Sequence, residues 1–216
     1  MGLTIGTNCG FVTSTPSADP NESNITLDSY AWAMKDTVPT GYTTITEIGW
    51  WYNSCSYMPA ANTWEACIYS DTLDEADSVV GTIQTGASVA TSLSDNWISY
   101  TGLNITVSAG SNYWIAVQVD STPSSAYCNY DHSGGDSHKK NSMTALPSSW
   151  GSSDTETSYI MAIYAIVSTG ATGTNTQINI GDDWKEIEGM QINIGDVWKD
   201  VASAKINIGD AWKTIF

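Results

Sequence analysis

NYWIAVQV, residues Asn112–Val119, is the stretch of sequence that decides the fold class. Almost every position from Tyr113 onward is apolar, and aromatic and β-branched side chains predominate, which is typical of a central strand covered on both faces. The sequence SYIMAIYAIV, residues 158–167, has the same character and is expected to close the same domain. Both stretches predict a core built from sheets.

Further β-rich stretches flank this segment and are separated by clusters of Gly, Pro, Asn, Asp and Ser. No helical periodicity appears between them, and the chain has no arginine and few other residues that favour helices. Strands at this spacing predict an all-β protein with a β-sandwich or jelly-roll domain over residues 1–168. The additional predicted strands are Tyr30–Met34, Thr43–Tyr52, Trp64–Tyr69 and Trp97–Val107.

A different pattern begins after a linker at residues 169–176, which is rich in Gly and Thr. Residues 177–185 read QINIGDDWK, residues 191–199 read QINIGDVWK and residues 205–213 read KINIGDAWK, so each copy starts 14 residues after the previous one. Each copy combines a β-branched strand, a Gly-Asp pair suited to a tight turn, and a second strand that begins near a tryptophan. Residues 177–216 are therefore predicted to form three β-hairpin repeats.

These repeats carry more apolar positions than small hairpins can cover. The next apolar residue lies three positions after each tryptophan, as Ile187 follows Trp184, and this odd spacing places the two on opposite faces of a regular strand. A ribbon of about 45 residues cannot cover both of its faces, and short hairpins are marginal in isolation. We therefore expect docking onto the sandwich, onto identical copies or onto a partner protein, through residues Ile178, Ile180, Trp184, Ile192, Ile194, Trp198, Ile206, Ile208 and Trp212.

The formal net charge of −16 disfavours two classes of partner. Contacts to phosphate need lysine and arginine, so neither nucleic acid nor an anionic membrane surface is expected. No apolar run approaches the roughly 18 residues of a membrane span, and residues 1–10 lack the pattern of an export signal. The sequence predicts a protein made in the cytoplasm that reaches the outside, where it does so, by lysis, by assembly or by an unrecognised route.

Four cysteines, Cys9, Cys55, Cys67 and Cys128, are scattered through the predicted sandwich. They lack the spacing of a metal site, and two interpretations remain open. An even number permits two disulfides, whereas buried free thiols behave as small hydrophobic side chains.

Two groups of polar residues are candidates for a metal or catalytic site. The only histidines, His132 and His138, lie in a Gly/Ser/Asp-rich stretch at Asp131–Lys140 without fixed ligand spacing or a nucleophile motif, so a solvated loop is the favoured interpretation. We therefore expect neither enzymatic activity nor a bound cofactor. The second group is acidic and contains Asp71, Asp74, Glu75 and Asp77. These carboxylates could bind a structural calcium ion, but a solvated acidic turn is the favoured interpretation.

Ten tryptophans and eleven tyrosines supply candidate binding surfaces, because exposed aromatic rings can stack on sugars. The repeat tryptophans are interpreted as structural, and Trp32, Trp97 and Trp114 as core residues. The core interpretation is also favoured for most of the aromatics from Trp50 to Trp64, a stretch that includes Trp51, Tyr52 and Tyr57. Loops commonly carry binding residues, so a glycan site is predicted at Tyr127, Tyr130, Asp131 and Trp150.

Two segments resemble known protein families. The three WK-containing copies resemble the "GG-x-WK" repeats near the C-termini of bacteriophage tail and fibre-associated proteins, although Asp182, Asp196 and Asp210 stand where the second glycine is commonest. The IYSD sequence at 68–71 and the GSNYWIAV sequence at 110–117 look like jelly-roll modules of phage virion proteins and of secreted bacterial surface proteins.

These resemblances imply a non-enzymatic virion protein made in the host cytoplasm, such as a head decoration, neck or tail-fibre component. In that role the repeats would dock or form a homo-oligomer, and the sandwich would be displayed outward. Two alternatives stay open: a carbohydrate-binding module of a secreted or cell-surface protein, and a subunit of an extracellular filament.

Overall fold

A computed structural model describes residues 2–20, 23–53, 63–88, 95–119 and 126–169, together with the backbone of six short strands between residues 177 and 214. Cys55 and Tyr57 lie outside the described residues. The chain divides into two compact units, residues 1–169 and residues 170–216, each of which is described by itself.

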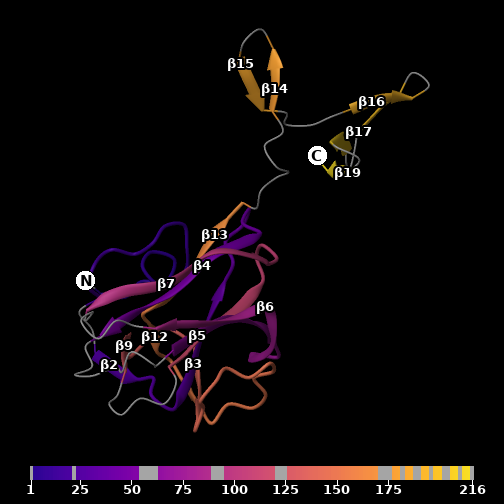
Figure 1. Ribbon diagram of the computed structural model, residues 1–216. Coiled ribbons are helices and arrows are strands. Elements are labelled where there is room, and N and C mark those ends of the chain that lie inside the picture. Colours follow the sequence, from indigo (N-terminus) through magenta and orange to yellow (C-terminus); the bar gives the residue numbers. More distant parts are fainter. Residues whose placement is uncertain are drawn as a thin grey trace. The chain divides into compact units, whose positions relative to one another are not determined.

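The first unit is a β-sandwich of two sheets, which confirms the predicted fold class (Figure 1). All neighbouring strands are antiparallel except β1 and β13, which run parallel. The β4 sheet contains β1 Gly10–Val12, β2 Ser23–Thr26, β4 Thr44–Asn53, β7 Asn96–Thr106, β9 Tyr127–Asp131, β12 Ile160–Met161 and β13 Ile163–Ser168. The β8 sheet has the order β11 Thr155–Thr157, β10 Ser137–Asn141, β3 Tyr30–Thr37, β8 Asn112–Val119, β5 Thr63–Thr72 and β6 Glu75–Ser88.

Strand β8 lies between β3 and β5 in the middle of its sheet, and this position explains its continuous apolar sequence. Ile115 and Val117 belong to the core between the two sheets. Trp114 and Ala116 belong to a second apolar cluster on the opposite face. Successive side chains of a strand point to opposite faces, so a strand buried on both faces has apolar residues at most positions. Gln118 is a buried exception, and its side-chain amide donates to the carbonyl oxygens of Val119 and Met143.

Tryptophan rings fill much of the core between the sheets. Trp50 of β4 and Trp64 of β5 pack edge to face across the sandwich, with ring centroids 6.1 Å apart. Trp51 and Tyr52 are also buried, as are Trp32 and Trp114, so the core interpretation is confirmed for these residues. Trp97 was also predicted to be a core residue but is only partly buried; it packs against the core, and its ring centroid lies 5.4 Å from that of Trp51.

The outer face of the β8 sheet is covered by the chain that follows β10. Leu146 and Trp150 pack on this face, and the Tyr69 hydroxyl donates a hydrogen bond of 2.6 Å to the carbonyl oxygen of Pro147. Small residues beneath them leave room for this close approach. The cluster comprises Ala31, Ala33, Cys67, Tyr69, Ala76, Trp114, Ala116, Leu146 and Trp150.

Contacts on the outer face of the β4 sheet involve the N-terminal segment. The Trp97 indole N–H donates to the carbonyl oxygen of Ala18 at 3.1 Å, and Glu47 accepts hydrogen bonds from Thr15 and Tyr164. Parts of both outer faces are thus covered by the protein's own chain.

The described cysteines are buried free thiols. Cys9, Cys67 and Cys128 form no disulfide, so the second of the two open interpretations holds for them. Burial raises the pKa of the Cys9 thiol to about 12 and also raises the pKa values of Cys67 and Cys128.

The second unit contains three separate two-stranded antiparallel sheets. Their register is the same in each copy: Asn179 pairs with Trp184, Asn193 with Trp198, and Asn207 with Trp212. The Gly-Asp pairs predicted to form the turns, at residues 181–182, 195–196 and 209–210, lie outside the described residues. The strands are β14 Gln177–Ile180, β15 Asp183–Glu186, β16 Gln191–Ile194, β17 Val197–Asp200, β18 Lys205–Ile208 and β19 Ala211–Thr214.

Within the described residues, no helix has the length and apolar character needed to cross a membrane.

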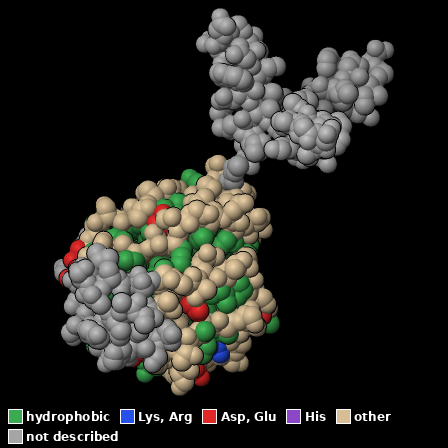
Figure 2. Space-filling view, in the orientation of Figure 1, with side chains coloured by type: hydrophobic (Ala, Val, Ile, Leu, Met, Phe, Trp, Pro, Cys, Tyr) green, Lys and Arg blue, Asp and Glu red, His purple; other side chains and the backbone are tan. Residues whose placement is uncertain are grey.

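The face of the sandwich in Figure 2 is mostly neutral and polar, with small groups of hydrophobic side chains and few charged ones.

Candidate functional site

Trp150 is not the exposed sugar-binding residue that the sequence predicted. Its side chain is 1 % exposed, and its ring packs edge to face on Tyr69 with centroids 5.3 Å apart. Its indole N–H donates to the Ser153 hydroxyl oxygen at 3.0 Å. The prediction was wrong because this loop folds back on the β8 sheet and uses the ring to bury an apolar face.

The other three predicted glycan-binding residues lie on β9 but do not share one face. Strand alternation places Tyr127 and Asp131 on one face of β9 and Tyr130 on the other. Tyr130 packs against the core at the edge of the sandwich and is partly exposed. The structure therefore does not gather Tyr127, Tyr130, Asp131 and Trp150 into one site.

Tyr130 belongs instead to an aromatic group with His132 and Tyr159, which we call the Tyr130 cluster. Its ring centroid lies 4.5 Å from that of Tyr159 and 4.8 Å from that of His132. His132 is exposed, as a solvated loop predicts, and both tyrosines are partly exposed. Gly135 permits this arrangement, because a Cβ atom there would lie 2.1 Å from the carbonyl oxygen of Tyr159.

His138 lies in a different environment from His132. It is 3 % exposed and belongs to β10, so the prediction of a solvated loop was wrong for this residue. Register places it opposite Ala33 of β3 on one side and opposite Glu156 of β11 on the other. Its ring lies against the Trp114 ring, with centroids 4.1 Å apart. Ala33 is small enough to let these two rings meet across β3.

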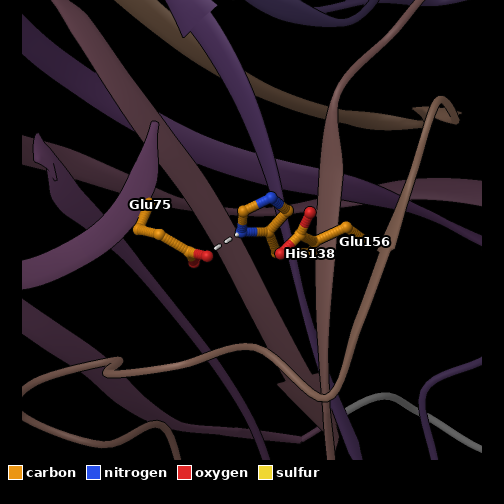
Figure 3. Close-up of side chains that lie close together, drawn as sticks. All are labelled: Glu75, His138 and Glu156. Carbon is orange, nitrogen blue, oxygen red and sulfur yellow. Dashed lines mark ion pairs between the residues drawn. The ribbon is translucent and has the colours of Figure 1, made fainter. Parts of the chain in front are cut away.

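Carboxylates approach both nitrogens of the His138 ring. Nδ1 lies 3.1 Å from Oε2 of Glu75, and Nε2 lies 3.7 Å from Oδ1 of Asp136. Glu75, His138 and Glu156 each offer one ligand atom, and these atoms all lie within 4.8 Å of one another (Figure 3). Three strands that are distant in sequence, β6, β10 and β11, thus contribute to one group, which we call the His138 cluster.

Hydrogen bonds connect the His138 cluster to the covering loop. The Ser153 hydroxyl oxygen accepts from Trp150, lies 3.0 Å from Nδ1 of His138, and lies 3.2 Å from Oε2 of Glu75. The hydroxyl has a single hydrogen, so it can donate to only one of these two groups at a time. Ser153 thereby links the buried tryptophan to the histidine and its carboxylate.

The acidic residues suggested for calcium do not converge on one point. The Asp71 carboxylate accepts the Trp114 indole N–H at 2.8 Å, Asp74 pairs with Lys35, and Asp77 accepts from the Thr72 hydroxyl. The Lys35 ammonium lowers the pKa of Asp74. Glu75 alone of the four faces the histidine. Their separate partners favour a hairpin end stabilised by individual contacts over a shared calcium site.

Sequence reasoning missed three residues of these clusters: Ser153, Glu156 and Tyr159. Ser153 lies in the loop at residues 142–154, and Glu156 and Tyr159 follow it; the path of this loop over the sheet could not be read from the local sequence. Strand register brings Glu156 to His138, and only long-range pairing fixes that register.

Comparison with known proteins adds no relative. No protein-family model, no curated protein sequence and no solved structure matches the chain.

Proposed function

We propose that this chain is a non-enzymatic structural component of a bacteriophage virion, of the head-decoration, neck or tail-fibre kind. The three hairpins dock it onto other virion proteins or onto copies of itself, and the sandwich is displayed outward. The resemblance of the repeats to those of phage tail and fibre-associated proteins supports this assignment.

The observation that carries the proposal is the common register of the three hairpins. Each register places two isoleucine positions, such as Ile178 and Ile180, with Lys185 and Asp183 on one face, and places Trp184 with Asn179 on the other. Both faces of a two-stranded ribbon therefore carry apolar residues in every copy. Two-stranded hairpins are marginal in water, so these positions need a surface to cover them.

The sandwich has the opposite character, because its own chain covers parts of both outer faces. Its lysines are also engaged internally: Lys35 pairs with Asp74, Lys139 lies 4.9 Å from the Tyr30 ring, and Lys140 donates to the carbonyl oxygen of Ser152. Three lysines that already have partners are poorly suited to binding phosphate groups. These contacts support the proposal of a displayed domain that does not itself bind phosphate.

The test compares the oligomeric state of the full chain with that of a variant in which Trp184, Trp198 and Trp212 are all replaced by serine. Light scattering should report an oligomer for the natural sequence and a monomer for the variant. Replacing the paired Asn179, Asn193 and Asn207 by serine is the matched control and should leave the oligomer intact. A natural chain that stays monomeric and also fails to bind purified particles would refute docking by the repeats.

Virion location is tested separately. Antibodies against the sandwich should label particles purified from a lysate that carries this gene. Detection only in the particle-free supernatant would refute the virion assignment and favour a secreted protein.

The Tyr130 cluster supports a second function, glycan recognition by the displayed sandwich. Partly exposed rings of Tyr130 and Tyr159 with an exposed imidazole beside them are suited to stacking on a sugar and to hydrogen bonding with its hydroxyl groups. Glycan-array binding should be lost in Tyr130→Ala and in Tyr159→Ala. The Tyr127→Ala variant is the control, because Tyr127 lies on the other face of β9; equal binding by all variants would refute the assignment.

A further inference from the structure

We propose that Glu75, His138 and Glu156 bind a divalent transition-metal ion, with Zn²⁺ as the probe ion. The site joins the end of the β5–β6 hairpin to β10 and to the edge strand β11 (Figure 3). It adjoins Trp114 and Trp150 of the apolar cluster on the outer face of the β8 sheet, and it shares no residue with the Tyr130 cluster.

The geometry of the first two ligands matches a metal site. In a tetrahedral site with bonds of about 2.0–2.2 Å, ligand atoms lie about 3.3 Å apart. The distance from Nδ1 of His138 to Oε2 of Glu75 is 3.1 Å. Glu156 is exposed and lies within the 4.8 Å spread of the group, so a rotation of its side chain can bring an oxygen to the third position.

The polar contacts at this position are compatible with a metal ion bound at Nδ1. A neutral imidazole with its proton on Nε2 would direct the Nδ1 lone pair at the Glu75 carboxylate, and two acceptors in contact repel each other. A proton on Nδ1 or a metal ion removes that repulsion. Lys35 cannot supply the charge, because its ammonium pairs with Asp74 and Asp136. Among the described residues, no lysine pairs with Glu75 or Glu156.

Surrounding contacts hold the imidazole in a suitable orientation. The Trp114 ring lies against the imidazole at a tilt of 38°, and Asp136 lies 3.7 Å from Nε2. When a metal ion binds Nδ1, the ring proton is on Nε2, the side on which the Asp136 carboxylate lies. In the covering loop, Trp150 donates a hydrogen bond to the Ser153 hydroxyl, which in turn can donate to the Glu75 carboxylate.

The donor set decides which ions fit. Imidazole nitrogen with carboxylate oxygens suits zinc and its first-row neighbours, whereas calcium and magnesium prefer oxygen ligands alone. An ion here would tie three strands together and hold the Trp150 loop against the sheet, which is a structural and not a catalytic role.

The experiment measures Zn²⁺ and Co²⁺ binding to the untagged full chain after treatment with a chelator. Calorimetry should find one ion per chain, Co²⁺ should develop visible absorption bands, and Zn²⁺ should raise the melting temperature of the sandwich. Glu156→Gln and Glu75→Gln should each weaken binding by about 10-fold or more, in line with the loss of a metal-site group. Circular dichroism checks that both variants fold.

Two control variants separate this site from its neighbours. His132→Gln removes the only other histidine, and Asp77→Asn removes a carboxylate two residues from Glu75; both should bind Zn²⁺ as the natural chain does. The proposal is overturned if the natural chain binds neither ion, if binding survives unchanged in Glu156→Gln and Glu75→Gln, or if His132→Gln abolishes it.

Discussion

Replacing Trp150 by alanine should destabilise the sandwich strongly, although the residue lies in a loop rich in serine. Its side chain is 1 % exposed and packs on Tyr69 in the cluster over the β8 sheet. Truncation of a buried tryptophan costs about 3–5 kcal/mol, and the lost hydrogen bond to Ser153 adds about 1 kcal/mol where its partner stays buried. We expect a loss of about 4 kcal/mol in the free energy of unfolding.

Urea unfolding followed by circular dichroism measures this loss. With a slope of about 2 kcal/mol per molar urea, the midpoint should fall by about 2 M. Tyr127→Ala, at a half-buried position on β9, is the control and should shift the midpoint much less. A change within about 0.5 kcal/mol for Trp150→Ala is what an exposed residue would give, and it would show that the loop does not cover the sheet.

Three further predictions follow from the fold. A chain without residues 170–216 should keep the circular dichroism spectrum and melting curve of the sandwich and scatter light as a monomer, because residues 1–169 form a compact unit; a loss of folded structure would contradict this division. Iodoacetamide at pH 8 should leave Cys9 and the other two buried thiols unmodified in the native chain and should label them in urea, as measured by peptide mass spectrometry. At a pKa of about 12, only about one Cys9 side chain in ten thousand is a thiolate at this pH, and the thiolate is the form that reacts. Because Lys35 lowers the pKa of Asp74, their ion pair should stabilise the fold above the ordinary carboxyl pKa of 3.8 and lose its effect as the pH falls through the lower value of the folded state. The stability of the Asp74→Asn variant should therefore depend less on pH during acid unfolding than that of the natural chain. Identical unfolding curves would show that the ion pair does not contribute to stability.

The fold class was predictable because it depends on local patterns. Continuous apolar sequence in Asn112–Val119 predicted a central strand, and the structure places this strand between β3 and β5 with both faces covered. The buried positions of Trp50 and Trp64 were predictable in the same way, because aromatic residues in strand patterns usually face a core.

The candidate sites were less predictable because they depend on long-range pairing. His138 lies in a stretch rich in Gly, Ser and Asp, yet pairing with Ala33 and Glu156 makes it part of a sheet. Trp150 has the sequence context of a loop, and its burial depends on the hydrogen bonds that hold residues 142–154 on the sheet, such as that from Tyr69. Neither the strand pairing of His138 nor the burial of Trp150 can be predicted from the neighbouring sequence.

Threefold repetition of one hairpin changes the energetics of the proposed docking. A single hairpin offers only a small contact, which is weak after the loss of translational and rotational freedom. Once the first copy binds, the second and third bind from within the same chain, and avidity can raise the overall affinity by about 100-fold to 10,000-fold without any new kind of contact. The gain requires identical sites on the partner at a spacing that the chain can span. Symmetric assemblies of repeated subunits provide such sites, so the repeats and the proposed place in a virion call for the same kind of partner.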